Sequence, residues 1–180
     1  MIIGNFVKEI KLIYKNYYFS GICSNSSKCK KNFIFFAIKG TNIDGNKFIN
    51  HAIKKGATII ISNQNFEGIK KNTLFIKSSN VRKSLSEFAC RLYKNKPKNI
   101  IAVTGTNGKS SVADFYYQIL RLNKKRVASI GTLGIKNNNR VKKVSNTTID
   151  PITLNEVLNK LKKEKINDVI LEASSHGLKQ

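Results

Sequence analysis

The stretch VTGTNGKSS, residues 103–111, joins a short apolar run to a segment whose apolar residues recur at helical spacing. In such a loop, glycines let backbone N–H groups turn toward phosphate oxygens, a lysine neutralises their charge, and the next hydroxyl can ligate Mg²⁺. Val103 stands where the strict phosphate-loop pattern has a further glycine, so the match is to a shorter variant, and an ordinary glycine-rich turn is the alternative. We expect ATP and Mg²⁺ to bind at Gly105, Thr106, Asn107, Gly108, Lys109, Ser110 and Ser111.

The sequence on both sides of this loop predicts a parallel sheet. Strands are expected at 99–103, 126–130 and 168–172, and helices at 109–122 and 151–163, the second of them capped by Asp150. A strand–helix–strand succession of this kind implies parallel strands. The polar segment 136–143 is expected to form a loop or a hairpin tip.

The first half of the chain predicts a smaller α/β domain. Phe6, Ile10, Ile13 and Tyr17 recur at helical spacing, which predicts a short amphipathic helix. Further strands are expected at 33–38, 57–62 and 74–76, and further helices at 47–55 and 81–92. Pro97 ends the last helix, so we place the domain boundary there, with domains at 1–97 and 98–180.

The chain is strongly basic. Its 180 residues include 33 lysines and arginines against 10 acidic residues, which gives a formal charge of +23. Such a charge makes nucleic acid a possible partner. Because the lysines are scattered through nearly every segment and no arginine-rich block occurs, we favour a solvated basic surface and expect no nucleic-acid partner. A basic surface would also favour a substrate that carries phosphates and carboxylates.

The cysteines and the apolar runs indicate where the protein resides. Cys23, Cys29 and Cys90 form neither a CxxC pair nor an even framework, which favours a reduced, cytoplasmic setting and argues against zinc. No apolar run approaches the ~20 residues of a membrane span. The N-terminal 16 residues also lack the pattern of a signal peptide, so we expect no membrane partner.

Glu172 directly follows the apolar residues Val169 to Leu171, so we expect it at the C-terminal end of a central strand, where open α/β sheets bind ligands. Its carboxylate and the Ser110 hydroxyl could together ligate an ATP-bound Mg²⁺. The alternative is a carboxylate that only caps the following turn. The nearby Ser174-Ser175-His176 suggests a hydrolase, which we discount because a serine nucleophile needs a histidine from across space.

Taken in order, segments along the whole chain resemble the Mur ligase family. They are FIFFAIKGTNIDGNKFINHAIKKGATIII at 33–61, AVTGTNGKSS at 102–111, IGTLG at 130–134 and LEASSHGL at 171–178. The last two, with the triplet Asn146-Thr147-Thr148, resemble the UDP-N-acetylmuramoyl-tripeptide synthetase (MurE) family more than the next ligase of the pathway. Taken singly, the triplet and the loops near Ser24 and Thr41 would be ordinary polar turns.

The resemblance implies a fold and an activity. The implied fold class is α/β, with a small N-terminal uridine-nucleotide-binding domain followed by a truncated P-loop-type parallel-sheet ATP-binding domain. The implied activity belongs to peptidoglycan precursor synthesis. An ATP-dependent amide ligase adds a diamino acid, meso-diaminopimelate or L-lysine, to UDP-MurNAc-L-Ala-D-Glu through an acyl phosphate.

The resemblance also implies roles for single residues. Lys109 would contact the β- and γ-phosphates, and Ser110 and Glu172 would hold Mg²⁺; Lys109 and Glu172 are the implied catalytic residues. The uridine-diphosphate end of the substrate would contact Ser24, Ser26, Thr41, Asn42 and Ile43. Its sugar and peptide would contact Asn146, Thr147, Thr148, Ser174 and Gln180.

Some features depart from the family pattern. The chain has Asn25-Ser26-Ser27 where the family usually has Asp-Ser-Arg, Ala102 in place of a common glycine, and Ser110-Ser111 in place of two threonines. The pattern also extends beyond Gln180. We therefore expect these 180 residues to carry an unpaired sheet edge with exposed apolar surface. We also expect them to be inactive alone. The complete ligase is expected to be a monomer.

Two alternatives remain open at this point. One is the D-Ala-D-Ala-adding ligase of the same family. The other, of a different class, is a noncatalytic module that binds nucleotides or nucleic acid.

Overall fold

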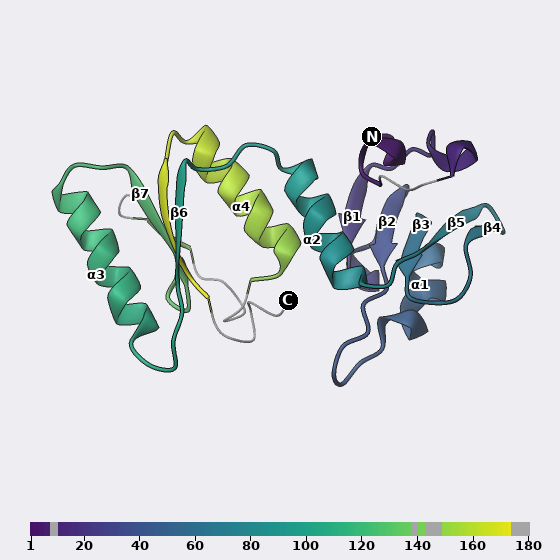
Figure 1. Cartoon of the computed structure of the whole chain (residues 1–180), viewed down its shortest axis with the longest axis horizontal. Helices are drawn as coiled ribbons and strands as arrows, with labels where there is room; N and C mark the ends of the chain where they lie inside the picture. Colours follow the sequence, from purple (N-terminus) through teal and green to yellow (C-terminus); the bar gives the residue numbers. More distant parts are fainter. Residues whose placement is uncertain (8–10, 138–139, 143–148, 174–180) are drawn as a thin grey trace. The chain divides into compact units, whose positions relative to one another are not determined.

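Each half of the chain is built around its own β-sheet (Figure 1). The computed structural model describes residues 1–7, 11–137, 140–142 and 149–173. The two sheets belong to separate units, Met1–Arg91 and Leu92–Gln180. The α/β class expected from the sequence is confirmed for both units.

The sheet of the first unit has the strand order β1-β2-β3-β5-β4. Four strands are parallel, and β4 runs antiparallel to β5. The strands are β1 (Gly21–Cys23), β2 (Phe33–Phe36), β3 (Ala57–Ser62), β4 (Gly68–Lys70) and β5 (Thr73–Lys77). Sequence reasoning found β2, β3 and β5 but missed β1 and β4, because three residues are too few to show a strand's alternation of polar and apolar side chains.

The helices of this unit match the predicted positions. Helix α1 (Ile49–Lys54) continues a 3₁₀ turn at Gly45–Phe48, and Gly56 follows it with a left-handed φ of 105°. Helix α2 (Val81–Leu92) begins after Asn80, whose side-chain oxygen accepts a hydrogen bond of 3.0 Å from the Lys83 N–H. This capping contact gives one of the unpaired N–H groups of the first turn a partner.

The predicted N-terminal amphipathic helix is wrong. The chain forms two 3₁₀ turns instead, Ile3–Asn5 and Leu12–Tyr14. These turns are tied together by long-range backbone hydrogen bonds, from Ile3 N–H to the Tyr17 carbonyl (2.9 Å) and from Gly4 N–H to the Lys15 carbonyl (3.0 Å). Ile13, placed by prediction on a buried face, is 73% exposed, while Ile3 and Tyr14 are buried. Ile10 lies outside the described residues.

The three cysteines are free, and they differ in exposure. Cys23 and Cys29 are buried in one apolar cluster with Ala52 of α1, whereas Cys90 is exposed. Burial raises the pKa of the Cys23 thiol far above its usual range, and it raises the pKa of Cys29 as well. Both thiols are therefore protonated in the folded chain at neutral pH, and only Cys90 is open to attack.

We expect a thiol reagent to modify only Cys90 rapidly in the folded chain, and all three cysteines in denaturant. Mass spectrometry of the modified chain identifies which cysteine has reacted. Rapid modification of Cys23 or Cys29 in the folded chain would contradict this assignment.

The raised pKa values also predict a pH effect. Above about pH 8.5 the unfolded chain loses these thiol protons while the folded chain keeps them, so the free energy of unfolding falls as the pH rises.

The sheet of the second unit has the strand order β6-β10-β7-β8-β9. The strands are β6 (Asn99–Val103), β7 (Val127–Gly131), β8 (Gly134–Asn137), β9 (Arg140–Lys142) and β10 (Asp168–Glu172). Strands β6, β10 and β7 are parallel, and β8 and β9 add an antiparallel hairpin. Because β10 lies between β6 and β7, the C-terminal ends of all three strands meet at one edge of the sheet.

Two helices pack on this sheet as predicted. Helix α3 (Lys109–Leu122) follows β6, and helix α4 (Pro151–Lys163) precedes β10. The Asp150 side chain caps α4 by accepting hydrogen bonds from the N–H groups of Ile152 (3.0 Å) and Thr153 (3.1 Å). None of the helices in the described ranges is long and apolar enough to cross a membrane.

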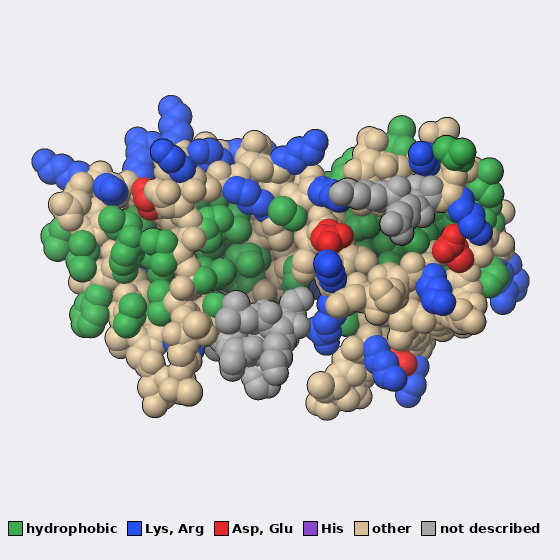
Figure 2. All heavy atoms as spheres, in the orientation of Figure 1, with side chains coloured by type: hydrophobic (Ala, Val, Ile, Leu, Met, Phe, Trp, Pro, Cys, Tyr) green, Lys and Arg blue, Asp and Glu red, His purple; other side chains and the backbone are tan. Residues whose placement is uncertain are grey.

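Helix α3 and the edge strand β6 of the second unit expose apolar side chains to solvent. In helix α3 the exposed side chains are Val112, Phe115, Tyr116, Ile119 and Leu122, and Figure 2 shows hydrophobic side chains gathered over this helix. On β6, Ile100 and Ile101 are also exposed, and within the described residues β6 pairs with β10 alone. The expected unpaired edge and exposed apolar surface are therefore present in this structure.

Candidate phosphate and magnesium site

The predicted phosphate loop joins β6 to α3. Gly105 has a φ of 147° and Gly108, which precedes the first residue of the helix, has a φ of 77°. Only glycine adopts such angles without strain, which explains the two glycines of the motif. The Lys109 ammonium donates to the carbonyl oxygens of Gly105 (2.7 Å) and Thr106 (3.0 Å). The lysine is therefore held over the loop, where its charge would meet a phosphate.

Glu172 lies next to this loop. It is the last residue of β10, and the following N–H, that of Ala173, donates to the Val103 carbonyl at the end of β6 (2.9 Å). The Ser110 hydroxyl donates to Glu172 Oε2 at 3.0 Å, across 62 residues of sequence. The structure thus brings together the two residues that the sequence predicted as Mg²⁺ ligands.

The geometry of this pair fits a magnesium ion. Octahedral Mg²⁺ binds oxygens at about 2.0–2.1 Å, so two adjacent ligands are about 3 Å apart. The Ser110 and Glu172 oxygens already have this separation, and the ion would take the place of the hydrogen bond between them. No group of three or more His, Cys, Asp or Glu residues that could hold a metal occurs in the part of the chain that the structure describes. Mg²⁺ that arrives with nucleotide phosphates typically takes only one or two ligands from the protein, the others being phosphate oxygens and waters.

Two residues that orient Glu172 were not predicted. Thr132 donates to Glu172 Oε2 from its N–H (3.3 Å) and from its hydroxyl (3.0 Å). At the adjacent Gly131, an added Cβ would lie 2.4 Å from the Glu172 carboxyl carbon. A larger residue at position 131 would therefore displace the carboxylate from this place. The IGTLG segment contains both residues, but nothing in its local pattern connects it with Glu172.

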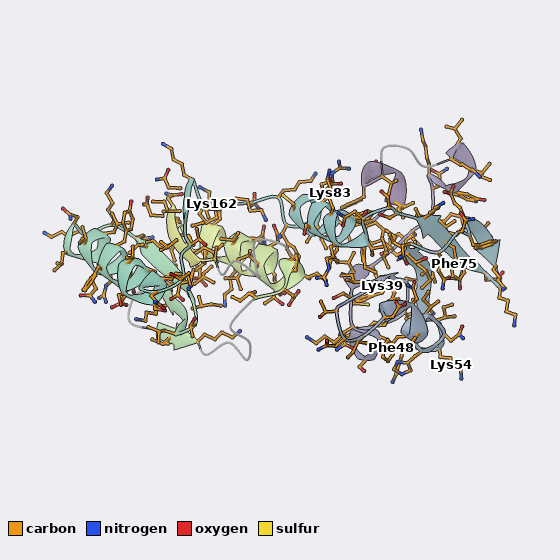
Figure 3. The ribbon with its side chains drawn as sticks, turned by 60° about the horizontal axis from the view of Figure 1, so that its bottom comes forward. Lys39, Phe48, Lys54, Phe75, Lys83 and Lys162 are labelled. Carbon is orange, nitrogen blue, oxygen red and sulfur yellow. The ribbon has the colours of Figure 1, made fainter. Side chains whose placement is uncertain are left out.

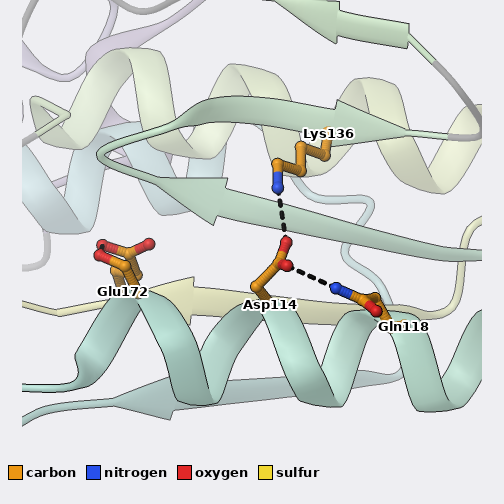
Figure 4. Close-up of polar contacts among 5 residues, drawn as sticks. Asp114, Gln118, Lys136 and Glu172 are labelled. Carbon is orange, nitrogen blue, oxygen red and sulfur yellow. Dashed lines mark hydrogen bonds and ion pairs between the residues drawn. The ribbon is translucent and has the colours of Figure 1, made fainter.

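Helix α3 carries a second carboxylate, that of Asp114, one turn after Ser110. Asp114 accepts hydrogen bonds from the Lys136 ammonium (2.5 Å) and the Gln118 amide (2.6 Å), as Figure 4 shows beside Glu172. The hydrogen bond from Lys136, supported by that from Gln118, lowers the pKa of Asp114 below its usual range. Asp114 thus forms an ion pair that joins α3 to β8, whereas Glu172 is hydrogen-bonded to uncharged donors.

The predicted uridine-nucleotide residues lie on two neighbouring loops of the first unit. Ser24 and Ser26 follow β1, and Thr41 to Ile43 follow β2, its parallel neighbour, so both loops start from the same edge of the sheet. Ser26 is buried, whereas Thr41, Asn42 and Ile43 are exposed. The second loop is closed by a hydrogen bond of 2.8 Å from Gly40 N–H to the Ile43 carbonyl.

The other predicted residues are those expected to contact the sugar and peptide of the substrate. Asn146, Thr147, Thr148, Ser174 and Gln180 lie outside the described residues.

One basic groove was not predicted at all. It measures about 660 Å³ and lies beside α1, and its lining includes Lys54, Lys70, Lys71, Phe66 and Phe75. Figure 3 labels Lys54 and Phe75. No predicted site residue lines this groove, so it is a separate feature of the first unit.

Comparison with known proteins places both units in one family. Residues 18–93 match the family model described as Mur ligase family, catalytic domain, and residues 103–180 match the Mur ligase middle domain. Among curated relatives, the UDP-N-acetylmuramoyl-L-alanyl-D-glutamate–2,6-diaminopimelate ligase of Rickettsia prowazekii is 43% identical over 177 residues, which are 96% of this chain and 36% of that protein. The ligase of the same name from Bradyrhizobium diazoefficiens is 38% identical over 161 residues, or 89% of this chain and 33% of the relative.

Solved structures agree with this assignment. A structure of UDP-N-acetylmuramoyl-L-alanyl-D-glutamate–2,6-diaminopimelate ligase superposes with a TM-score of 0.81 and 27% identity, and covers 99% of this chain and 37% of its own. The MurF ligase of Thermotoga maritima, solved with ADP, is similar in fold alone, with a TM-score of 0.54, 20% identity and coverage of 86% and 32%. The chain spans about a third of the length of the curated relatives it matches. On these matches, and on the phosphate loop with its adjacent Glu172, the chain belongs to the Mur ligase family.

Proposed function

We propose that the chain acts in an ATP-dependent ligase that adds a diamino acid to UDP-MurNAc-L-Ala-D-Glu. The observation that carries this proposal is the contact between Ser110 and Glu172 beside the phosphate loop. The names of the curated relatives favour diaminopimelate as the added amino acid. We further propose that residues 1–97 bind the uridine-diphosphate end of the substrate and that residues 98–180 bind ATP, in a cytoplasmic enzyme that is a monomer when complete.

In the proposed reaction, a carboxylate oxygen of the D-glutamate attacks the γ-phosphorus of ATP, and ADP leaves. The amine of the incoming amino acid then attacks the resulting acyl phosphate, and phosphate leaves as the amide forms. Lys109 and the N–H groups of the loop would neutralise charge on the β- and γ-phosphates. Ser110 and Glu172 would hold Mg²⁺, which supplies further positive charge to these oxygens when it is bound. Thr132 would keep the Glu172 carboxylate oriented toward Ser110.

The substrate is tested with a pair of ligands that differ by one amino acid. We expect the 180-residue chain, in calorimetric titration, to bind UDP-MurNAc-L-Ala-D-Glu and to release no phosphate with ATP. We expect weaker binding of UDP-MurNAc-tripeptide, because a group bonded to the γ-carboxylate would occupy the position where the phosphoryl group must arrive. Preference for the tripeptide form would overturn this choice and favour the ligase that adds D-Ala-D-Ala.

The charge of +23 supports one rival of another class, a noncatalytic module that binds nucleic acid. Salt-titrated binding to duplex and single-stranded DNA separates the two proposals. Non-specific contacts alone give a Kd of roughly 10⁻⁴–10⁻⁶ M at physiological salt, and we expect no tighter binding. Sub-micromolar affinity with a steep dependence on salt would favour the rival.

A further inference from the structure

Ser26, one of the proposed uridine-nucleotide residues, is hydrogen-bonded to a histidine from another part of the first unit. Ser26 Oγ and His51 Nδ1 are 2.9 Å apart, and 25 residues separate them in the sequence. Ser26 is only 6% exposed. Among the described residues, the histidine ring is the one side-chain hydrogen-bond partner of the Ser26 hydroxyl.

Packing holds the two residues at this distance. Ser26 begins a 3₁₀ turn, Ser26–Lys28, that is capped by the Asn25 side chain, which accepts from the Ser27 N–H at 2.9 Å. Cys23 precedes this loop and Cys29 follows it, and both pack in one apolar cluster with Ile49 and Ala52 of α1, the helix that carries His51. Both ends of the loop are thus anchored against the helix, while His51 itself lies at the surface of the unit.

The hydrogen bond decides what the Ser26 hydroxyl can offer a ligand. A hydroxyl has one proton to donate, and a neutral imidazole carries its proton on only one nitrogen. If Nδ1 lacks the proton, it accepts from Ser26, and only lone pairs of the serine oxygen remain for a ligand. If Nδ1 carries the proton, it donates to Ser26, and the serine O–H is available to an acceptor oxygen. A uridine diphosphate presents acceptor oxygens on its phosphates and on its uracil ring, and a hydrogen bond from Ser26 to one of these oxygens requires the second arrangement.

We propose that His51 is a positioning residue for the uridine-nucleotide end of the substrate. It orients the Ser26 hydroxyl by donating to Ser26 Oγ from Nδ1, so that the hydroxyl donates to an oxygen of the ligand. This inference rests on the proposed function, because Ser26 matters to the ligand only if the loop after β1 binds a uridine nucleotide.

The test measures binding of UDP to the 180-residue chain and to its variants. We expect H51L to weaken binding about tenfold, as the loss of one well-placed hydrogen bond predicts. H51Q keeps a side-chain amide that can donate to Ser26, so we expect it to restore most of the affinity. In a S26A background, H51L should cause no further loss, because His51 acts through Ser26. N50L, an exposed change on the neighbouring residue of α1, is the matched control and should bind like the unsubstituted chain.

The histidine ring supplies a second measurement that a purely structural role would not affect. The chain has only two histidines, so ¹⁵N labelling of histidine gives two pairs of ring-nitrogen signals, and H51Q identifies which pair belongs to His51. The shifts of the two ring nitrogens report which of them carries the proton. We expect saturation with UDP to move His51 toward the form protonated at Nδ1.

The outcomes separate the two proposals. If the unsubstituted chain binds UDP but the losses from H51L and S26A are additive, or the ring shifts of His51 stay unchanged, the positioning role is wrong and the proposed function stands. If the folded, unsubstituted chain does not bind UDP, the proposed function is contradicted, and the role of His51 with it. Thermal melting of each variant shows whether a loss of binding reflects a loss of fold.

Discussion

Replacing Glu172 by glutamine is expected to abolish the gain in ATP affinity that Mg²⁺ provides. Glutamine keeps the size of the side chain but removes the charge, and its amide group would bring a donor to a place where Ser110 and Thr132 already donate. A contact to a charged group is worth about 1.5–3 kcal/mol, so we expect ATP affinity in Mg²⁺ to fall roughly 10- to 100-fold. Affinity in the presence of a chelator should change little.

The measurement is the Kd of a non-hydrolysable ATP analogue, with and without Mg²⁺, for the unsubstituted chain and for E172Q. E156Q is the matched control, because this substitution makes the same chemical change at an exposed position of α4 in the same unit. Equal responses to Mg²⁺ in E172Q and in the unsubstituted chain would show that Glu172 holds no metal.

Truncating Phe88 is expected to cost the first unit about 3–5 kcal/mol of unfolding free energy. Phe88 on α2 is buried, and its ring contacts Phe6, Phe19 and Phe36, with ring centroids 5.4, 6.3 and 5.3 Å away. F88A would leave a cavity where a helix, a strand and the N-terminal segment meet. A loss of this size is a large part of the 5–15 kcal/mol that typically stabilises a domain.

Hydrogen exchange of the backbone amides measures this loss separately for residues 1–91. We expect F88A to lower the protection of β2 and β3 strongly. F48A removes the same ring from a position that is 40% exposed, so it should change protection little. Similar losses in F88A and F48A would mean that the aromatic cluster is not the centre of this core.

The sequence predicted the longer elements of the fold well, because these elements carry their own start and stop signals. Asp150 and Pro151 mark the start of α4, and strands β3, β6 and β10 are apolar runs bounded by polar residues. The N-terminal segment failed because its apolar residues have helical spacing, while tertiary hydrogen bonds such as that from Ile3 to Tyr17 hold it in two short turns. Such long-range contacts are invisible to a local pattern.

The parts of the candidate site that belong to one continuous motif or end a recognisable strand could be predicted from the sequence. The phosphate loop is continuous in the sequence, and Glu172 could be placed because it ends a recognisable strand. Thr132, Gly131 and His51 could not be placed, because their importance comes from contacts across the fold, to Glu172 and to Ser26. No spacing rule in the sequence connects His51 to a serine 25 residues earlier.

The most direct test of the account is a crystal structure of the chain with Mg²⁺ and a non-hydrolysable ATP analogue. We predict phosphates on the N–H groups of residues 105–110, the Lys109 ammonium turned from the Gly105 carbonyl toward the phosphates, and Mg²⁺ bound to Ser110 Oγ and Glu172. Nucleotide bound elsewhere, for example in the basic groove beside Lys54 and Phe75, with Ser110 and Glu172 still hydrogen-bonded to each other, would contradict the account.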